Sequence, residues 1–209
     1  MIVAAQDFYR KLTVNNAKDW WEANRGTYDD VLKPAALTLL EDLAEPLARI
    51  AGEPVKGKLF RPHRDVRFSK DKTPYKPHLH MMWTMQVEVS EAPVFFFGVG
   101  VDSVTVGAGR MGFEKPMLEN WRKFVDLDTK RVLGIIDGIK AHGFGLRDPA
   151  LKRVPSGFAA DHAAGDLLRM KGCIATKDMG TPADLNGALI AAFREVAPLN
   201  ALLLQIAEA

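Results

Sequence analysis

The sequence predicts a single α+β domain over residues 1–209, in which N-terminal and C-terminal helices pack on a central antiparallel sheet. Apolar residues recur at helical spacing before residue 52 and after residue 115, whereas they alternate with polar residues between residues 59 and 107. The links between the alternating segments are short, which favours hairpins and hence an antiparallel meander of about four or more strands. No repeat, low-complexity tract or linker divides the chain.

The N-terminal third is predicted to be helical. Asn16 followed by Asp19 resembles a capping box, and a helical stripe covers residues 17–32. Pro34 either kinks this helix or opens the next one, and the next stripe ends at Gly52, a residue type that commonly follows a helix.

Period-two patterns predict the strands, and helical patterns predict the remaining helices. The expected strands are 59–68, 79–89, 94–102, 103–107 and 171–177. The expected helices are 115–125, 130–141, a short one capped by Asp161 and ending at residue 168, and a last one opened by Thr181-Pro182 and kinked or divided at Pro198. Residues 143–157 are expected to form a loop or a short strand.

Composition narrows the class of protein. The net charge is only +2, so electrostatic binding has to come from a local cluster. The single cysteine, Cys173, excludes an intramolecular disulfide and fits a reducing cytoplasm. No secretory signal is visible, and the apolar runs look too short to span a bilayer. We therefore expect a cytoplasmic protein without membrane contact, of undetermined oligomeric state.

A dense basic segment covers residues 61–76. Its cations are Arg61, Arg64, Arg67, Lys70, Lys72 and Lys76, and its only acids are Asp65 and Asp71. Cations at this density repel one another, so an anionic partner would explain them: phosphate, carboxylate or a nucleic-acid backbone. The alternative is an internal ion-pair network that ties the segment to carboxylates of the N-terminal helices. The residues alone leave both explanations open.

Alternation along a strand over 59–68 would sort the side chains of this segment onto two faces. One face would carry Arg61, His63, Asp65 and Arg67. The other, including Phe68, is mostly apolar and is expected to face the helices. Arg64 lies on this apolar face, and a buried guanidinium keeps its charge, so Arg64 needs a carboxylate or a ligand anion.

Three separated blocks resemble a widespread and uncharacterised bacterial family, the domain of unknown function 2461 family. They are Phe8-Tyr9-x-x-Leu12-x-x-Asn15-Asn16-x-x-x-Trp20-Trp21-x-x-Asn24-Arg25-x-x-Tyr28, Arg61-x-x-Arg64-Asp65-x-Arg67-Phe68-Ser69-Lys70-Asp71-Lys72-x-Pro74-Tyr75-Lys76, and Gly157-Phe158-Ala159-Ala160-Asp161-His162-x-Ala164-x-x-Leu167-Leu168-Arg169-x-Lys171. The resemblance covers nearly the whole chain. It implies one compact α+β domain, and it brings no known reaction, cofactor or catalytic residue.

Three other patterns suggest chemistry only weakly. His63, Asp65, His78 and His80 could meet across a hairpin and hold a divalent metal, but the nearby arginines oppose a cation. Gly107-x-Gly109-x-x-Gly112 matches a dinucleotide fingerprint, yet it follows strands that look antiparallel. Asp161-His162 could be an acid–base pair, although a capping role explains Asp161 better. No metal and no cofactor is expected.

The sequence therefore favours an anion-binding protein, and it leaves open whether the protein is an enzyme such as a hydrolase or transferase acting on a small phosphorylated or carboxylated molecule. The expected anion ligands are Arg61, Arg64, Arg67, Lys72 and Lys76, with Asp71 in the same set. Asp65 would orient the arginines or act as a general base. Tyr75 and Asn24 would position the molecule.

Two alternatives remain on the sequence. The first is a non-catalytic nucleic-acid-binding module, in which the basic hairpin tracks phosphates and Tyr75 stacks on a base. The nearly balanced net charge makes this less favoured than a small anionic ligand. The second is a purely structural clamp of ion pairs between the sheet and the helices.

Overall fold

The computed structural model describes residues 1–209 and confirms the α+β class. Six strands form one sheet in the order β1-β2-β3-β4-β6-β5, and every neighbouring pair is antiparallel. The strands are β1 (Val55–Leu59), β2 (Leu79–Met85), β3 (Val94–Val99), β4 (Val104–Arg110), β5 (Gly145–Leu146) and β6 (Cys173–Asp178). The first four form the predicted meander, and β6 returns from the C-terminal part of the chain to extend it.

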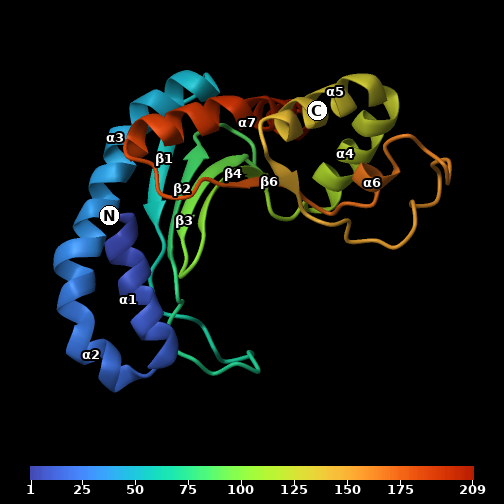
Figure 1. Ribbon diagram of the computed structural model, residues 1–209. Helices are drawn as coiled ribbons and strands as arrows, with labels where there is room; N and C mark the ends of the chain where they lie inside the picture. Colours follow the sequence, from blue (N-terminus) through green and yellow to red (C-terminus); the bar gives the residue numbers. More distant parts are fainter.

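Helices precede the sheet and surround its later strands. They are α1 (Ile2–Val14), α2 (Lys18–Thr27), a π-helical turn η1 (Tyr28–Leu32), α3 (Lys33–Ala51), α4 (Lys115–Leu127), α5 (Thr129–Ala141), the short α6 (Gly165–Leu168) and α7 (Leu185–Ala207). α3 and α7 pack together over the sheet, and α4, α5 and α6 form a group at the other end of α7 (Figure 1).

The sheet has one covered face and one open face. Along β2, every second residue from Leu79 to Met85 is buried, and the residues between them are partly exposed. β3 alternates in the same way. The covered face packs against α3 and α7 as part of a continuous core of 44 buried residues. There the buried indole of Trp83 donates to the carbonyl oxygen of Leu40 at 3.1 Å, which satisfies its only polar group.

The π-helical turn marks the place where two predicted helices join. α2, η1 and α3 follow one another without a gap, and Pro34 lies in the first turn of α3. A proline cannot donate to the carbonyl four residues earlier, and its ring crowds that carbonyl. The wider turn of η1, closed by the bond from Lys33 N to Tyr28 O, makes room for it. Gly52 ends α3 with φ +76°, as its residue type predicts.

The strand predicted over 59–68 is wrong in its position. β1 ends at Leu59, and Phe68, expected on the core side, is 96% exposed. Within β1, Gly57 lies close to α3, and a Cβ there would lie only 3.0 Å from the side chain of Leu40. The missing side chain lets β1 approach α3 closely, and no alternation pattern reports such a contact.

The C-terminal half differs from prediction in its helix starts. Asp161 does not cap a helix, since α6 begins only at Gly165. α7 begins at Leu185 and is capped by Asp184, which accepts from Gly187 N at 3.0 Å. Pro198 lies within α7, which continues through it. By length and composition α7 could cross a membrane, contrary to the sequence estimate, but much of it is buried as the central core helix.

Candidate functional site

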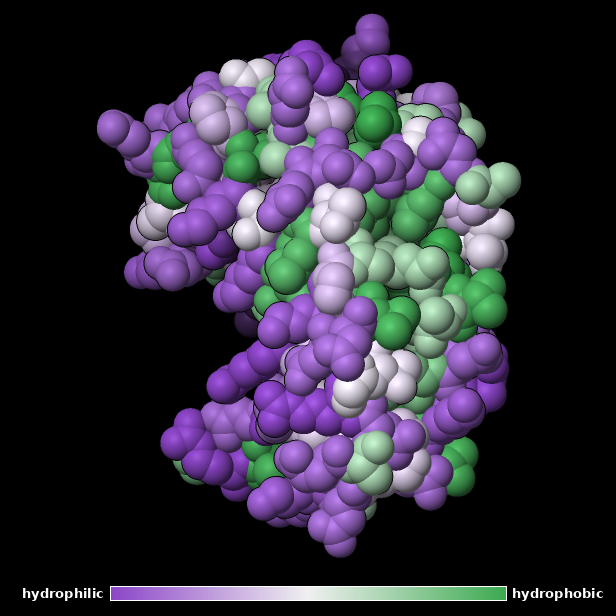
Figure 2. Space-filling view, turned by 90° about the vertical axis from the view of Figure 1, so that its left-hand side faces the viewer, coloured by the Kyte–Doolittle hydropathy of each residue, from purple (hydrophilic) through white to green (hydrophobic).

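Residues 60–78 leave the sheet between β1 and β2 as a hairpin extension. Its base is a short ladder: Arg64 N donates to Pro74 O and Lys76 N donates to Pro62 O, each at 2.8 Å. The ladder carries a tip, residues 65–73, that projects away from the sheet (Figure 1). In the space-filling view the outline is hollowed on one side between two lobes, and the mostly hydrophilic lower lobe lies at the height of α2 and the hairpin extension (Figure 2).

Most charges of the tip are paired within the hairpin extension itself. Arg64 Nη1 lies 2.5 Å from Asp71 Oδ2 and donates to the carbonyl of Thr73 at 3.1 Å. Arg67 makes two bonds to Asp65, Nε to Oδ1 at 2.9 Å and Nη2 to Oδ2 at 2.7 Å. The counter-ions of these arginines therefore come from the same segment and not from the helices.

These pairs change the protonation behaviour of both carboxylates. Bonds from the backbone of Thr73 and then from Arg64 lower the pKa of Asp71 to about 2. Bonds from Arg67 lower the pKa of Asp65. Because a carboxylate with a lowered pKa accepts protons poorly at neutral pH, the geometry gives little support to Asp65 as a general base.

Two other predicted ligands are also occupied locally. Lys72 Nζ donates to the backbone carbonyl of Val66 at 3.0 Å, inside the tip. Asn24 Nδ2 donates to Trp20 O at 2.8 Å, one turn back in its own helix. Both interactions are the kind that orders a segment.

The first two family-like blocks meet where the hairpin extension docks on α2. Asn16 holds the backbone of Tyr75 from both sides: its Nδ2 donates to Tyr75 O at 2.9 Å, and its Oδ1 accepts from Tyr75 N at 3.1 Å. The ring of Tyr75 stacks on Trp21 with centroids 4.4 Å apart, and His63 packs edge-on against both rings. Tyr75 is only 3% exposed, so its ring is part of the core and is not free to stack on a ligand.

A groove of about 460 Å³ lies beside this contact, between α2–η1 and residues 59–63. Phe60 contributes partly exposed aromatic surface, the buried rings of Trp21 and Tyr28 back the groove, and the π-helical turn supplies Tyr28 and Asp29. π-helical turns often occur at functional sites. Most of the lining comes from the two family-like blocks and the residues next to them, so this groove is the site that they build together.

Charged side chains of both signs line the groove. Arg25 Nε is paired with Asp29 Oδ2 at 2.7 Å. Lys33, Arg61 and Glu22 also line the groove and form no ion pair. The groove therefore offers two cations and one carboxylate outside any ion pair, although Asp29 and then Glu22 raise the pKa of Arg25, and bonds from Arg67 and then the charge of Arg61 lower the pKa of Asp65. The sequence prediction included Arg61 and missed Lys33, since nothing in the pattern of the helices links Lys33 to residue 61. It considered Glu22 only as a possible ion-pair partner of the basic segment.

A second group of cations surrounds Phe60 next to the groove. Lys58 Nζ lies 5.0 Å and Lys76 Nζ 5.5 Å from the centre of its ring, and His80 stacks on the ring with centroids 4.7 Å apart. Neither lysine has an acidic partner. Burial and then the neighbouring charges of Arg61 and Lys58 lower the pKa of Lys76, as expected for cations held together against their repulsion.

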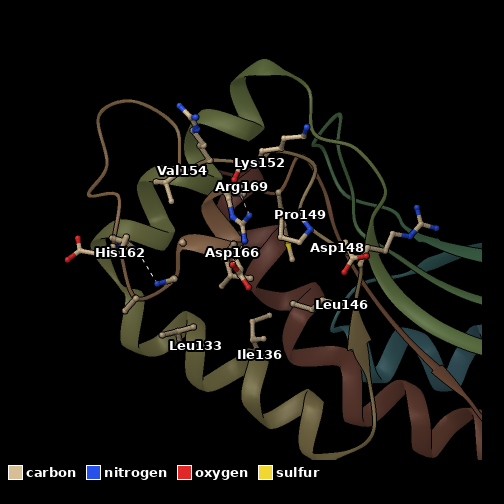
Figure 3. Close-up of a pocket in the computed structure, with 18 of the residues that line it drawn as sticks. Leu133, Ile136, Leu146, Asp148, Pro149, Lys152, Val154, His162, Asp166 and Arg169 are labelled. Atoms are coloured by element: carbon tan, nitrogen blue, oxygen red, sulfur yellow. Dashed lines mark hydrogen bonds and ion pairs between the residues drawn. The ribbon is translucent and has the colours of Figure 1, made fainter.

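The third family-like block builds a different cavity, of about 900 Å³, between α5, α6 and the segment that follows β5 (Figure 3). Leu133 and Ile136 from α5 form part of its wall. Arg169 lies beside Asp166, with which it is ion-paired, and donates to the carbonyl of Lys152 at 3.4 Å. Arg169 thus fastens the long segment to α6.

His162, at the edge of this cavity, pairs with a carboxylate other than the predicted one. Its Nδ1 accepts from Ala164 N at 3.0 Å, so the proton of a neutral ring sits on Nε2, which lies 3.2 Å from Asp126 Oδ1. The acid next to it in sequence, Asp161, is exposed. His162 therefore joins α4 to the segment before α6.

The structure does not assemble the metal group considered from sequence. No cluster of three or more histidine, cysteine or acidic side chains has metal-binding geometry. His63 packs on Trp21 and Tyr75, whereas His78 lies beside His80. The dinucleotide interpretation is wrong as well, because β4, which carries Gly107 and Gly109, pairs only with antiparallel neighbours.

The comparison with protein families gives a match that spans all three blocks. The model of the family described as "Conserved hypothetical protein (DUF2461)" matches residues 4–201, nearly the whole chain. The protein is therefore a member of this family. A search of curated proteins finds no significant match.

Proposed function

We propose that this protein binds a small organic anion, phosphorylated or carboxylated, in the groove between α2–η1 and residues 59–63, with Arg61 as its main ligand. The charge balance of the groove carries the proposal. Arg25 is neutralised by Asp29, whereas Arg61 and Lys33 have no acidic partner. A guanidinium in this situation suits an oxyanion, which it can bind through two parallel hydrogen bonds.

The floor of the groove favours an anion with a flat or apolar body. The partly exposed ring of Phe60 lines it, and Leu37 adds a side chain that is 41% exposed, whereas Trp21 and Tyr28 are buried behind them. Aromatic surface of this kind contributes binding free energy through contact area, while the cations orient the charged group. A bare inorganic anion would leave that surface unused.

In a hydrolase or transferase that acts at this groove, Glu22 is a better candidate for the general base than Asp65. Glu22 lines the groove and forms no ion pair. Asp65 is held by Arg67, and its pKa is lowered. Binding is the part of the proposal that the charges support most directly, so it is the part to test first.

The test is calorimetric titration with phenyl phosphate and with inorganic phosphate. We expect phenyl phosphate to bind more tightly, and Arg61→Gln to weaken it by roughly ten- to a hundredfold, since a hydrogen-bonded charged group contributes about 1.5–3 kcal/mol. Lys70→Gln is the matched control, because Lys70 is an exposed cation of the same segment that does not line the groove. Equal affinity of wild type and Arg61→Gln would refute the proposal.

The ion pairs of the tip favour a second, structural role for part of the basic segment. The partners of Arg64 are Asp71, Thr73 and Ser69, all within the tip. We therefore expect Arg64→Ala to loosen the tip without unfolding the domain. Limited proteolysis should show faster cleavage within residues 65–73 and an unchanged thermal midpoint. Global unfolding would show that the clamp reaches the sheet and helices after all.

A further inference from the structure

Over its first four strands the open face of the sheet has no acidic side chains; the acid on this face is Asp178 of β6, which lies opposite Thr105 of β4. β1, β2, β3 and β4 contain neither aspartate nor glutamate. On this face β1 places Lys56 and Lys58, which pair in register with Thr84 and Met82 of β2. Lys76 lies at the end of this row, over the ring of Phe60. The face therefore combines a basic margin with an uncharged middle.

Glycines keep the middle of this face low. A Cβ at Gly107 would lie 2.4 Å from Cζ of Phe96, so the phenyl ring occupies the space above this glycine. Gly98 lies opposite His80 in the ladder between β2 and β3. Because glycine has no side chain to occupy this space, the rings of Phe96 and His80 can lie along the sheet, and both residues remain partly exposed.

The rings form a row across β2, β3 and the residue that follows β1. Phe60 and His80 are stacked with centroids 4.7 Å apart, and His80 and Phe96 meet edge to face at 6.0 Å. Burial, then His78 and then Lys76 lower the pKa of His80 to about 4, so its imidazole is a neutral ring at neutral pH. Flat neutral rings beside cations are what nucleobases and phosphates require.

We propose that this open face binds single-stranded nucleic acid, with bases stacking on Phe96 and His80 and phosphates contacting Lys58, Lys56 and Lys76. The cations favour a polymer over a single small anion because of their arrangement. Lys56 and Lys58 are two residues apart on one strand, hence about 7 Å apart along the edge of the sheet. Such a row matches repeated phosphates, whereas a small anion needs cations that converge on one point.

The experiment is fluorescence anisotropy of the full chain with labelled oligothymidylate and oligouridylate of about twelve nucleotides. We expect dissociation constants of roughly 1–100 μM at low salt, rising with salt concentration. Phe96→Leu keeps apolar volume but removes the ring, and it should weaken binding about tenfold, whereas Phe96→Tyr should retain it. Binding of either the DNA or the RNA oligomer supports the proposal.

Two further variants separate charge from stacking. The double variant Lys58→Gln, Lys76→Gln should reduce the slope of log affinity against log salt by roughly 1.4, the value for two lost phosphate contacts. Lys130→Gln, an exposed cation on α5, should change nothing. No binding at low salt would overturn the proposal. The proposal would also be overturned if inorganic polyphosphate or a DNA duplex bound as tightly as the single-stranded oligomers and if Phe96→Leu did not change that binding.

This surface and the groove share Phe60, but Phe96 and the lysines of this surface belong to the sheet face alone, so each proposal can fail alone. Phe96 does not line the groove. Phe96→Leu is therefore expected to leave the titration with phenyl phosphate unchanged, and loss of phenyl phosphate binding in Arg61→Gln says nothing about Phe96.

Discussion

Replacing Asn16 with alanine tests how the hairpin extension is held on the helices. Asn16 makes two hydrogen bonds to the backbone of Tyr75, at 2.9 and 3.1 Å, and Tyr75 is 3% exposed. The substitution leaves a donor and an acceptor without partners in a nearly closed environment. Each such group costs about 1–3 kcal/mol. Asn16 itself is partly exposed, so water reaches one side, and we expect the free energy of unfolding to fall by about 2–4 kcal/mol.

Urea denaturation followed by far-UV circular dichroism measures this change. Asn15→Ala is the matched control, because Asn15 is the preceding asparagine and its amide donates only to Lys11 O, one turn back at the exposed end of α1. We expect the control to lose less than about 0.5 kcal/mol. If both variants lost the same small amount, the two bonds to Tyr75 would not hold the extension, and the account of how the groove is built would be wrong.

Three further predictions follow from other contacts. The pKa of Asp71 is lowered to about 2 in the folded protein, so its ionised carboxylate stabilises the tip above pH 4. This stabilisation is lost as the pH drops from about 4 to 2, and the resistance of the tip to an acid protease should disappear in that window. In Asp71→Asn the resistance should be absent at all pH values. Gly107→Ala places a Cβ 2.4 Å from Ala175 O and should destabilise the protein by about 1–3 kcal/mol in thermal melts. Gly138→Ala, in an open position on α5, should instead stabilise the protein by up to about 1 kcal/mol. Equal effects of the two substitutions would contradict the packing argument. The buried thiol of Cys173, with its pKa raised to about 12, should react with a thiol reagent at pH 8 only after denaturation, and rapid labelling of the native protein would show that β6 opens.

Local sequence patterns were sufficient to predict an element wherever one of its faces is buried and the other is exposed to solvent. The alternation in β2 appears in the structure as alternate burial, and Gly52 ends α3 as predicted. The same reasoning failed at β1, which ends at Leu59 and packs Gly57 closely against Leu40 of α3. It also failed at Asn16, whose side chain bonds to Tyr75, 59 residues away, and does not cap α2. In both cases a long-range contact outweighed a local preference.

The basic segment shows the same division for the candidate site. Its density of charge was visible in the sequence, and so was its resemblance to a family. Which charges pair with one another was not visible in the sequence. Arg64 and Arg67 have partners seven and two residues away in sequence, Asp71 and Asp65, although distant carboxylates on the helices were equally open choices. The path of the backbone decides which cation lies outside an ion pair. It places Arg61 at the groove.

The amino-acid sequence by itself determined the α+β class, most of the helices and strands, the family, and the segment in which to look for a site. These follow from periodicity and from residues that are adjacent in the chain. The tertiary structure decided which charges are neutralised, that Tyr75 is core, and that Lys33 and Glu22 join Arg61. It also decided that the sheet keeps one face open, which carries no acidic side chain over β1, β2, β3 and β4. Each of these depends on side chains that are far apart in the chain and close in space, because the free energy of a charge or a ring is set by what surrounds it.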